Sequence, residues 1–234
     1  MPSKNEVKTY VENSYYHLYN RGVEKRNIFL DQQDSSTFLS YLKDYLLPKN
    51  EKELRARLAN PKIDYKEKDK ILRLLRLNNF SDNLMLLAYC LMDNHFHFLV
   101  YQTLANTIQK FMNSLCTRYS MYFNKKYQRV GPLFQGIYKA VLINTEEQLL
   151  HLSRYIHIQA MSLEGNPLKI PKPSSYPNYL GKISQEWVKQ ETILGYFQTT
   201  KISFRGTSSA IDSYRSFVEE YKEEIPEIAH LVLD

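Results

Sequence analysis

The sequence predicts an α+β protein with one antiparallel sheet and helices on one face of it. Short apolar or alternating runs indicate strands, and two of these runs are separated by only two turn-forming residues. Longer segments with apolar residues three or four positions apart indicate helices. These segments follow one another in the order β, α, β, β, α, β, α, which is close to a ferredoxin-like arrangement.

The first strand is expected at residues 15–20, where aromatic residues recur before an Arg21-Gly22 turn. The first helix is expected over residues 34–47, which have apolar residues at helical spacing. Pro48 ends this helix, because proline lacks the backbone donor that a helix interior needs.

Residues 49–76 change to dense mixed charge with scattered leucines, which indicates a solvated pair of helices broken near Pro61. We interpret residues 48–79 as an insertion into a catalytic domain that spans residues 1–182. A helical C-terminal extension is expected over residues 183–234.

A β-hairpin is expected next. The apolar run at residues 84–92 is separated from the strand that begins at His95 by only Asp93 and Asn94, which favour turns.

The remaining elements of the expected domain follow in order. A long helix over residues 105–123 has basic residues on its polar face. Gly131-Pro132 interrupts the chain before a strand at residues 136–143. A last helix over residues 145–160 begins with an acidic first turn, which suits a helix N-terminus.

The chain is basic, with a formal net charge of +6 over 234 residues and a sequence pI near 9.1. This balance favours a polyanionic partner such as nucleic acid. No Asp or Glu occurs between Asn94 and Thr145, so we expect this segment to form a positive surface. The cations in it are Lys110, Arg118, Lys125, Lys126, Arg129 and Lys139.

The cysteines and the N-terminal sequence indicate the cellular compartment in which the protein is expected. Only Cys90 and Cys116 are present, without CxxC spacing, so neither a disulfide framework nor a thiolate zinc site is indicated. The N-terminus lacks an apolar signal core, and no run approaches the roughly 18 apolar residues that span a bilayer. We therefore expect a cytoplasmic protein without a membrane partner.

The strand that begins at His95 carries a second histidine at His97. Because alternate side chains of a strand leave opposite faces, the two imidazoles point one way, and Phe96 and Phe98 point the other, toward a core. Such a pair indicates a metal site, although an isolated His-x-His pair is more often ordinary packing or surface histidine.

A metal site needs at least a third protein ligand. The last expected helix carries Tyr155 and Gln159 at positions i and i+4, so both side chains lie on one face with β-carbons about 6 Å apart. His157 lies roughly 200° around the helix from Tyr155, and we expect it on the surface or behind the ligands.

Four segments together resemble the HUH-type single-tyrosine transposases, in particular the branch associated with repetitive extragenic palindromes. They occur in the family's order between residues 15 and 181, which is far more specific than a His-x-His pair alone. The segments are Tyr16-His17-Leu18-Tyr19-Asn20-Arg21-Gly22, Met92-Asp93-Asn94-His95-Phe96-His97, Gly131-Pro132-Leu133-Phe134-Gln135-Gly136 and Arg154-Tyr155-Ile156-His157-Ile158-Gln159.

This resemblance implies a metal-dependent single-strand DNA endonuclease and strand transferase that acts at hairpin-flanked sites through a 5′-phosphotyrosine intermediate. It makes Tyr155 the nucleophile and His95, His97 and Gln159 the ligands of a divalent cation, Mg²⁺ or Mn²⁺. Many relatives in this branch carry Asn at the position of Gln159, and either amide oxygen can coordinate.

The resemblance also implies single-stranded or hairpin DNA as the partner, and a homodimer. The basic helix is expected to grip the DNA backbone. The expected phosphate contacts are Lys110, Arg118, Lys125, Lys126 and Arg129.

Other interpretations remain open. Tyr155 could be a core residue, with Tyr119, Tyr122 or Tyr127 as the nucleophile instead. His17 could orient a neighbouring group or simply pack within its strand. The protein could also be a domesticated hairpin-binding protein with vestigial catalysis, or a replication-initiator-like nickase with the same metal and tyrosine chemistry.

Overall fold

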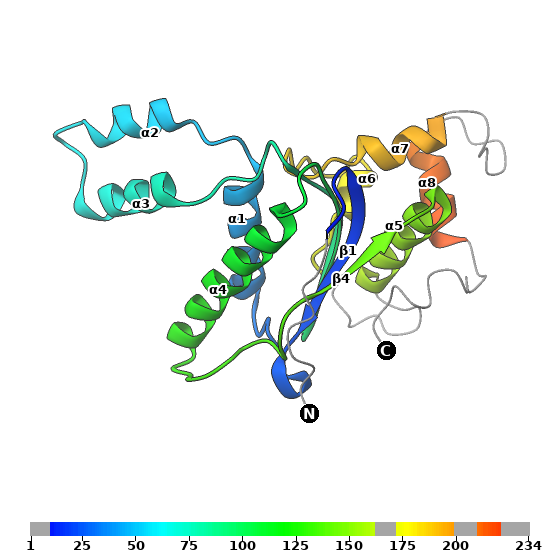
Figure 1. Cartoon of the computed structure of the whole chain (residues 1–234), viewed down its shortest axis with the longest axis horizontal. Helices are drawn as coiled ribbons and strands as arrows, with labels where there is room; N and C mark the ends of the chain where they lie inside the picture. Colours follow the sequence, from blue (N-terminus) through cyan, green and yellow to red (C-terminus); the bar gives the residue numbers. More distant parts are fainter. Residues whose placement is uncertain (1–9, 162–171, 199–209, 221–234) are drawn as a thin grey trace.

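The computed structural model describes residues 10–161, 172–198 and 210–220. Its centre is a four-stranded antiparallel sheet in the order β2-β3-β1-β4 (Figure 1). The strands are β1 (Ser14–Arg21), β2 (Leu84–Met92), β3 (His95–Gln102) and β4 (Lys139–Ile143). Helices connect β1 to β2 and β3 to β4, so the predicted ferredoxin-like α+β class is confirmed.

The predicted hairpin is formed by β2 and β3, with Asp93 and Asn94 in its turn. On its other side β3 pairs with β1, which places His97 opposite Tyr19. β4 is shorter than predicted and begins at residue 139 rather than 136. The reason is that the preceding loop pairs separately with the end of β1, through a bridge between Phe134 and Gly22.

One face of the sheet is covered by α1 (Gln32–Leu46) and α4 (Thr107–Lys126) (Figure 1). Aromatic side chains fill this layer: the ring of Phe38 on α1 lies 5.4 Å from that of Phe96 and 4.8 Å from that of Tyr119 on α4, measured between centroids. These three side chains are fully buried. The phenylalanine face of β3 therefore packs into a core, as its alternation predicts.

The opposite face is covered as well, which corrects the expectation of helices on one face only. It is covered by α5 (Glu146–Ala160), and α7 (Glu191–Gln198) and α8 (Ala210–Glu219) lie on the same side of the sheet (Figure 1). The physical reason is visible in β2, which is buried along almost its whole length. A strand with a continuous apolar run has two faces to bury, so one layer of helices does not suffice.

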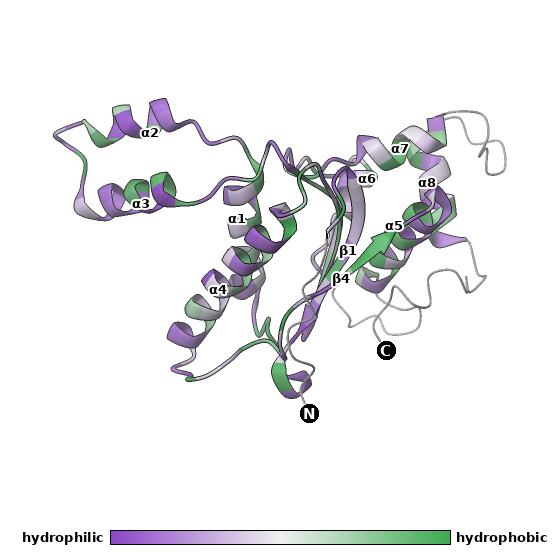
Figure 2. Cartoon of the chain, in the orientation of Figure 1, coloured by the Kyte–Doolittle hydropathy of each residue, from purple (hydrophilic) through white to green (hydrophobic). Residues whose placement is uncertain are grey.

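The charged segment forms the predicted pair of helices, α2 (Glu51–Leu58) and α3 (Tyr65–Arg76). They project away from the sheet in Figure 1, and Figure 2 shows hydrophilic residues over most of α2. Arg57 and Glu67 form an ion pair between the two helices. Ile71 is the one buried residue within them, so the pair is largely solvated.

The predicted C-terminal extension lies partly outside the described residues, and its boundary at residue 182 stays a prediction. Two short elements complete the described helices, α6 (Tyr176–Tyr179) and the 3₁₀ turn η1 (Val23–Lys25). Within the described ranges, no helix has both the length and the apolar character needed to cross a membrane. Cys90 and Cys116 are free thiols.

Candidate active site

The predicted pair of histidines lies on the face of β3 that α5 covers. The ring centroids of His95 and His97 are 4.9 Å apart. Phe96, between them in sequence, is fully buried on the other face. The two imidazoles therefore share one side of the sheet, as the strand alternation predicts.

His95 is half-buried at the start of β3, and its hydrogen bond identifies its tautomer. Its Nδ1 lies 2.6 Å from Oδ1 of Asn94, while the amide nitrogen of Asn94 donates to the carbonyl oxygen of Lys25 at 3.2 Å. The second bond assigns the oxygen end of the Asn94 amide, so Nδ1 of His95 is the donor. Neutral His95 therefore keeps a lone pair on Nε2, where a metal ion can bind.

His97 is fully buried and is held by a third histidine, His17 of β1. His97 Nδ1 lies 2.9 Å from His17 Nε2, and the two rings stack with centroids 5.1 Å apart. The other ring nitrogen of His97, Nε2, is buried without a hydrogen-bond partner among the described residues. Since buried polar atoms are normally paired, Nε2 marks the point at which an ion or ligand would complete the site.

Both imidazoles are held in the neutral form. Burial lowers the pKa of His97 well below its ordinary value, and the neighbouring His17 and His95 lower it further. Burial also lowers the pKa of His95, with a further contribution from the charge of Arg21 and an opposing one from Asp93. Because only a neutral imidazole can donate a lone pair to a metal, both shifts favour coordination near neutral pH.

Tyr155 of α5 lies against this histidine pair. Its ring makes an edge contact with His97, with centroids 5.6 Å apart and planes at 88°. The helix begins at Thr145, whose hydroxyl oxygen accepts a hydrogen bond from the backbone N–H of Gln148 at 3.1 Å. Ile156, fully buried, fixes the face of α5 that meets the sheet. Tyr155 is thus brought to His97 from an element far away in the sequence.

Gln159 lies one helical turn after Tyr155 and is half-buried near the end of α5. Lys172 ties this end of α5 to the β2–β3 turn, because its backbone N–H donates to the carbonyl oxygen of Ala160 and its ammonium group pairs with Asp93. Asp93 is two residues before His95. Gln159 and His95 are therefore held at the same end of the sheet, although the described contacts include no hydrogen bond between them.

The donors at this place fit a divalent cation. Among the described residues, no group of three or more His, Cys, Asp or Glu side chains could hold a metal ion. The predicted set is different, since it combines two imidazole nitrogens with the amide oxygen of Gln159. The partnerless Nε2 of His97 and the lone pair on Nε2 of His95 supply the nitrogen ligands.

Residues 55–159 match the family model described as "Transposase IS200 like". The match confirms the resemblance to the single-tyrosine transposases and covers somewhat less than half of the chain. It includes both histidines, Tyr155 and Gln159, and it ends at Gln159.

Comparison with solved structures gives a similar chain described as "Structure of the REP associates tyrosine transposase bound to a REP hairpin". The TM-score is 0.46 at 9% sequence identity, and the alignment covers 80% of this chain and 97% of that chain. No curated protein matches the sequence.

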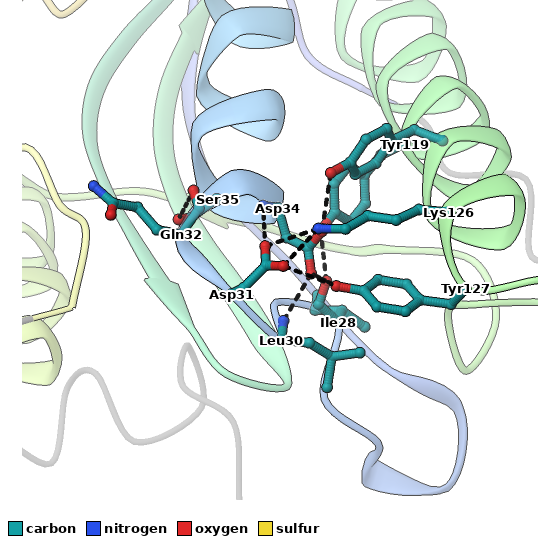
Figure 3. A network of polar contacts seen from close by, with 10 residues as sticks. Ile28, Leu30, Asp31, Gln32, Asp34, Ser35, Tyr119, Lys126 and Tyr127 are labelled. Carbon is teal, nitrogen blue, oxygen red and sulfur yellow. Dashed lines mark hydrogen bonds and ion pairs between the residues drawn. The ribbon is translucent and has the colours of Figure 1, made fainter.

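Within the segment that matches the transposase family, the competing tyrosines lie on the other face of the sheet. Tyr127 donates to Oδ2 of Asp34 at 2.8 Å, and Tyr122 donates to Oδ1 of the same carboxylate at 3.0 Å. Tyr119 donates to the carbonyl oxygen of Ile28. Figure 3 shows Tyr119 and Tyr127 in this network, and Figure 1 shows the sheet between α4, which carries Tyr119 and ends just before Tyr127, and α5, which carries Tyr155.

Two of the predicted DNA contacts in the transposase-like segment are already paired with acids of the α1 region. Arg118 donates to Asp44 at 2.8 Å. Lys126 pairs with Asp31 at 2.7 Å and with Asp34 at 2.8 Å (Figure 3). Their charges are therefore largely balanced within the protein.

The other predicted DNA contacts of this segment are more accessible. Lys110 and Lys125 are exposed on α4. Arg129 is half-buried and donates to Oδ1 of Asn124 at 2.9 Å. Lys110 and Lys125 lie on α4 and Arg129 follows it, and α4 is on the side of the sheet opposite to α5, the helix that carries Tyr155 (Figure 1).

His157, also in the matched segment, is not on the surface. It is fully buried, with Nδ1 2.7 Å from the hydroxyl of Tyr214 on α8 and Nε2 2.8 Å from that of Ser175. Burial lowers the pKa of His157 to about 3, so the ring is neutral. Of the two expectations for His157, the surface position was wrong, because α8 covers this side of α5. The sequence did not indicate how α8 packs.

Proposed function

We propose that this chain is a metal-dependent single-strand DNA endonuclease and strand transferase, a transposase that acts at hairpin-flanked sites through a 5′-phosphotyrosine intermediate. The observation that supports this proposal most directly is the position of Tyr155. The centroid of its ring lies 5.6 Å from that of buried His97, whose Nε2 has no hydrogen-bond partner in the described part of the chain. The family match over residues 55–159 supports the same class of DNA processing.

The proposed ligands of a divalent cation, Mg²⁺ or Mn²⁺, are Nε2 of His95, Nε2 of His97 and the amide oxygen of Gln159. When bound, such a cation supplies positive charge that polarises a phosphodiester and stabilises the departing oxygen. The hydrogen bonds of the two Nδ1 atoms, to Asn94 and His17, hold both rings in the orientation that leaves Nε2 free.

Tyr155 is the proposed nucleophile. Its phenol oxygen forms a bond to phosphorus while the bond between phosphorus and the 3′ oxygen breaks. The phenol releases its proton and the 3′ oxygen takes one up, which leaves a 5′-phosphotyrosine and a free 3′ hydroxyl. Because the new bond is also a phosphodiester, a 3′ hydroxyl can later reverse the step and join strands without a nucleotide cofactor.

A single-stranded segment beside a hairpin is the proposed substrate, because a phosphodiester within a regular duplex does not easily reach a half-buried tyrosine. Lys110, Lys125 and Arg129 are proposed to contact DNA away from the scissile bond, since α4, which carries or precedes them, lies on the opposite side of the sheet from α5. Arg118 and Lys126 contribute less, because they already pair with acids. A homodimer stays a proposal from the family resemblance.

Covalent capture tests this function. Labelled hairpin oligonucleotides with single-stranded flanks are incubated with the purified chain and Mn²⁺, and the products are separated under denaturing conditions. We expect adducts with the wild-type chain and with Tyr127→Phe, and none with Tyr155→Phe or in the presence of a chelator.

Two outcomes would contradict the proposal. A wild-type chain that binds hairpins but forms no adduct is a binding protein with a vestigial site. A chain that forms adducts and never joins strands is a nickase rather than a strand transferase.

A further inference from the structure

Arg21, the last residue of β1, lies at the same end of the sheet as the candidate site. It is directly opposite His95 in the pairing of β1 with β3. Paired residues of an antiparallel sheet project from the same face, so the Arg21 side chain belongs to the histidine face. This side chain is half-buried.

One nitrogen of the Arg21 guanidinium is anchored by the protein. Nε donates to Oε1 of Gln135 at 2.6 Å, and the backbone N–H of Gln135 donates to the carbonyl oxygen of Arg21 at 2.9 Å. The adjacent bridge between Phe134 and Gly22 holds this loop against the end of β1. These contacts orient the plane of the guanidinium.

The two terminal nitrogens of Arg21 have no carboxylate partner within residues 10–161, 172–198 and 210–220. Other cations beside the sheet do have one: Arg118 pairs with Asp44, and Lys126 pairs with Asp34. A half-buried cation without an acid of its own protein can still gain electrostatic stabilisation from an external anion. Arg21 is thus oriented by the protein but not neutralised by it.

We propose that Arg21 binds a phosphate of the single-stranded DNA next to the phosphodiester that Tyr155 attacks. This inference rests on the proposed function. A guanidinium matches phosphate oxygens through parallel hydrogen bonds, and with Nε bound to Gln135 both terminal nitrogens remain for this contact. A strand placed between His95 and Tyr155 passes the end of β1, where Arg21 is the register partner of His95.

The test measures binding and chemistry separately. Binding of a fluorescein-labelled hairpin with a single-stranded tail of randomised sequence is followed by anisotropy, in the Tyr155→Phe background so that no adduct forms. Arg21→Gln removes the charge, and Arg21→Lys keeps the charge but loses the paired N–H donors of the guanidinium. The control is Lys68→Gln, which removes one positive charge from an exposed position of α3, far from the site.

With Arg21→Gln we expect affinity to fall about tenfold, and the slope of log affinity against log salt to shrink by about 0.7, the value for one phosphate contact on a single strand. Arg21→Lys should lose less affinity, and Lys68→Gln should match the parent. Mn²⁺ affinity of Arg21→Gln should not decrease, which separates phosphate binding from damage to the fold.

Unchanged affinity and salt slope in Arg21→Gln would overturn the inference, as would a parent chain that does not bind the oligonucleotide. If wild-type protein forms adducts and Arg21→Gln forms them equally well, only the inference fails. If wild-type protein binds the strand through Arg21 and forms no adducts, the proposed function fails and the phosphate contact stands.

Discussion

On the α1–α4 face of the sheet, the fully buried carboxylate of Asp34 accepts hydrogen bonds from Lys126, Tyr127 and the backbone N–H of Leu30 (Figure 3). On the α5 face, a fully buried histidine, His97, keeps one ring nitrogen without a partner in the described part of the chain. Both regions place a tyrosine beside polar groups.

The difference lies in whether the network is complete. The Asp34 network satisfies its buried acid internally, so its tyrosines serve the fold and tie α1 to α4. The histidine network ends at Nε2 of His97, a buried nitrogen without a hydrogen-bond partner in the described part of the chain, and such an atom costs free energy unless something binds there. A tyrosine beside charged groups therefore indicates chemistry only when the network around it leaves a position for substrate or metal.

The largest effect is expected at His95. His95→Ala removes one proposed ligand from a half-buried position, so Mn²⁺ affinity and adduct formation should each fall about 100-fold or more. Isothermal titration with Mn²⁺ and the adduct assay measure these losses.

Tyr127→Phe is the counterpart on the other face. It removes the hydrogen bond to Asp34 and should lower the free energy of unfolding by about 1 kcal/mol, with Mn²⁺ affinity unchanged. If His95→Ala and wild type bind Mn²⁺ with equal affinity, the histidine network does not bind the metal and does not differ in this respect from the Asp34 network.

An intermediate effect is expected at His17, which holds Nδ1 of His97. His17→Leu keeps an apolar strand residue but loses the bond, so Mn²⁺ affinity should fall about 10- to 100-fold. His17→Gln should recover part of it, because its amide can reach the position of the imidazole Nε2. Tyr16→Phe, on the opposite face of β1, is the control. Equal losses in the Leu and Gln variants would assign His17 a packing role alone.

The smallest effect is expected in the Asp34 network, where the ion pair between Lys126 and Asp31 should make the stability of the fold depend on pH. The hydrogen bond from Lys126 lowers the pKa of the Asp31 carboxyl. A carboxyl with a lowered folded-state pKa stabilises the fold above its unfolded pKa, and this contribution is lost as the pH falls through the folded value.

Wild type should therefore melt at a higher temperature than Asp31→Asn near neutral pH, and the difference should shrink as the pH falls below the ordinary aspartate pKa of about 4. Asparagine still caps α1, so the variant tests charge alone. A difference in melting temperature that does not depend on pH would show that the ion pair contributes nothing measurable.

Local sequence patterns predict which residues lie on each face of β3 and of α5. Alternation along β3 separates Phe96 from His97 in any topology, and the i, i+4 spacing places Tyr155 and Gln159 on one face of α5. The order of strands and helices is sufficient for the fold class. These features depend on residues close together in sequence, which is why the sequence reveals them.

The features that the sequence did not predict depend on long-range pairing. The sequence left the role of His17 open, and its partner, His97, follows only from the register between β1 and β3, which no local pattern specifies. The acids that balance Arg118 and Lys126 come from the α1 region, far along the chain. The second helical layer was missed because a continuous apolar run such as β2 shows burial without showing which element covers each face.

The alternation of β3 has a consequence for how this chain can change over time. Insertion or deletion of a single residue within β3 would turn His95 and His97 into the aromatic layer and present Phe96 to Tyr155. A change in the length of β3 would therefore disturb both the buried aromatic core and the proposed metal site. The α2–α3 hairpin, with one buried residue, leaves ample room for them.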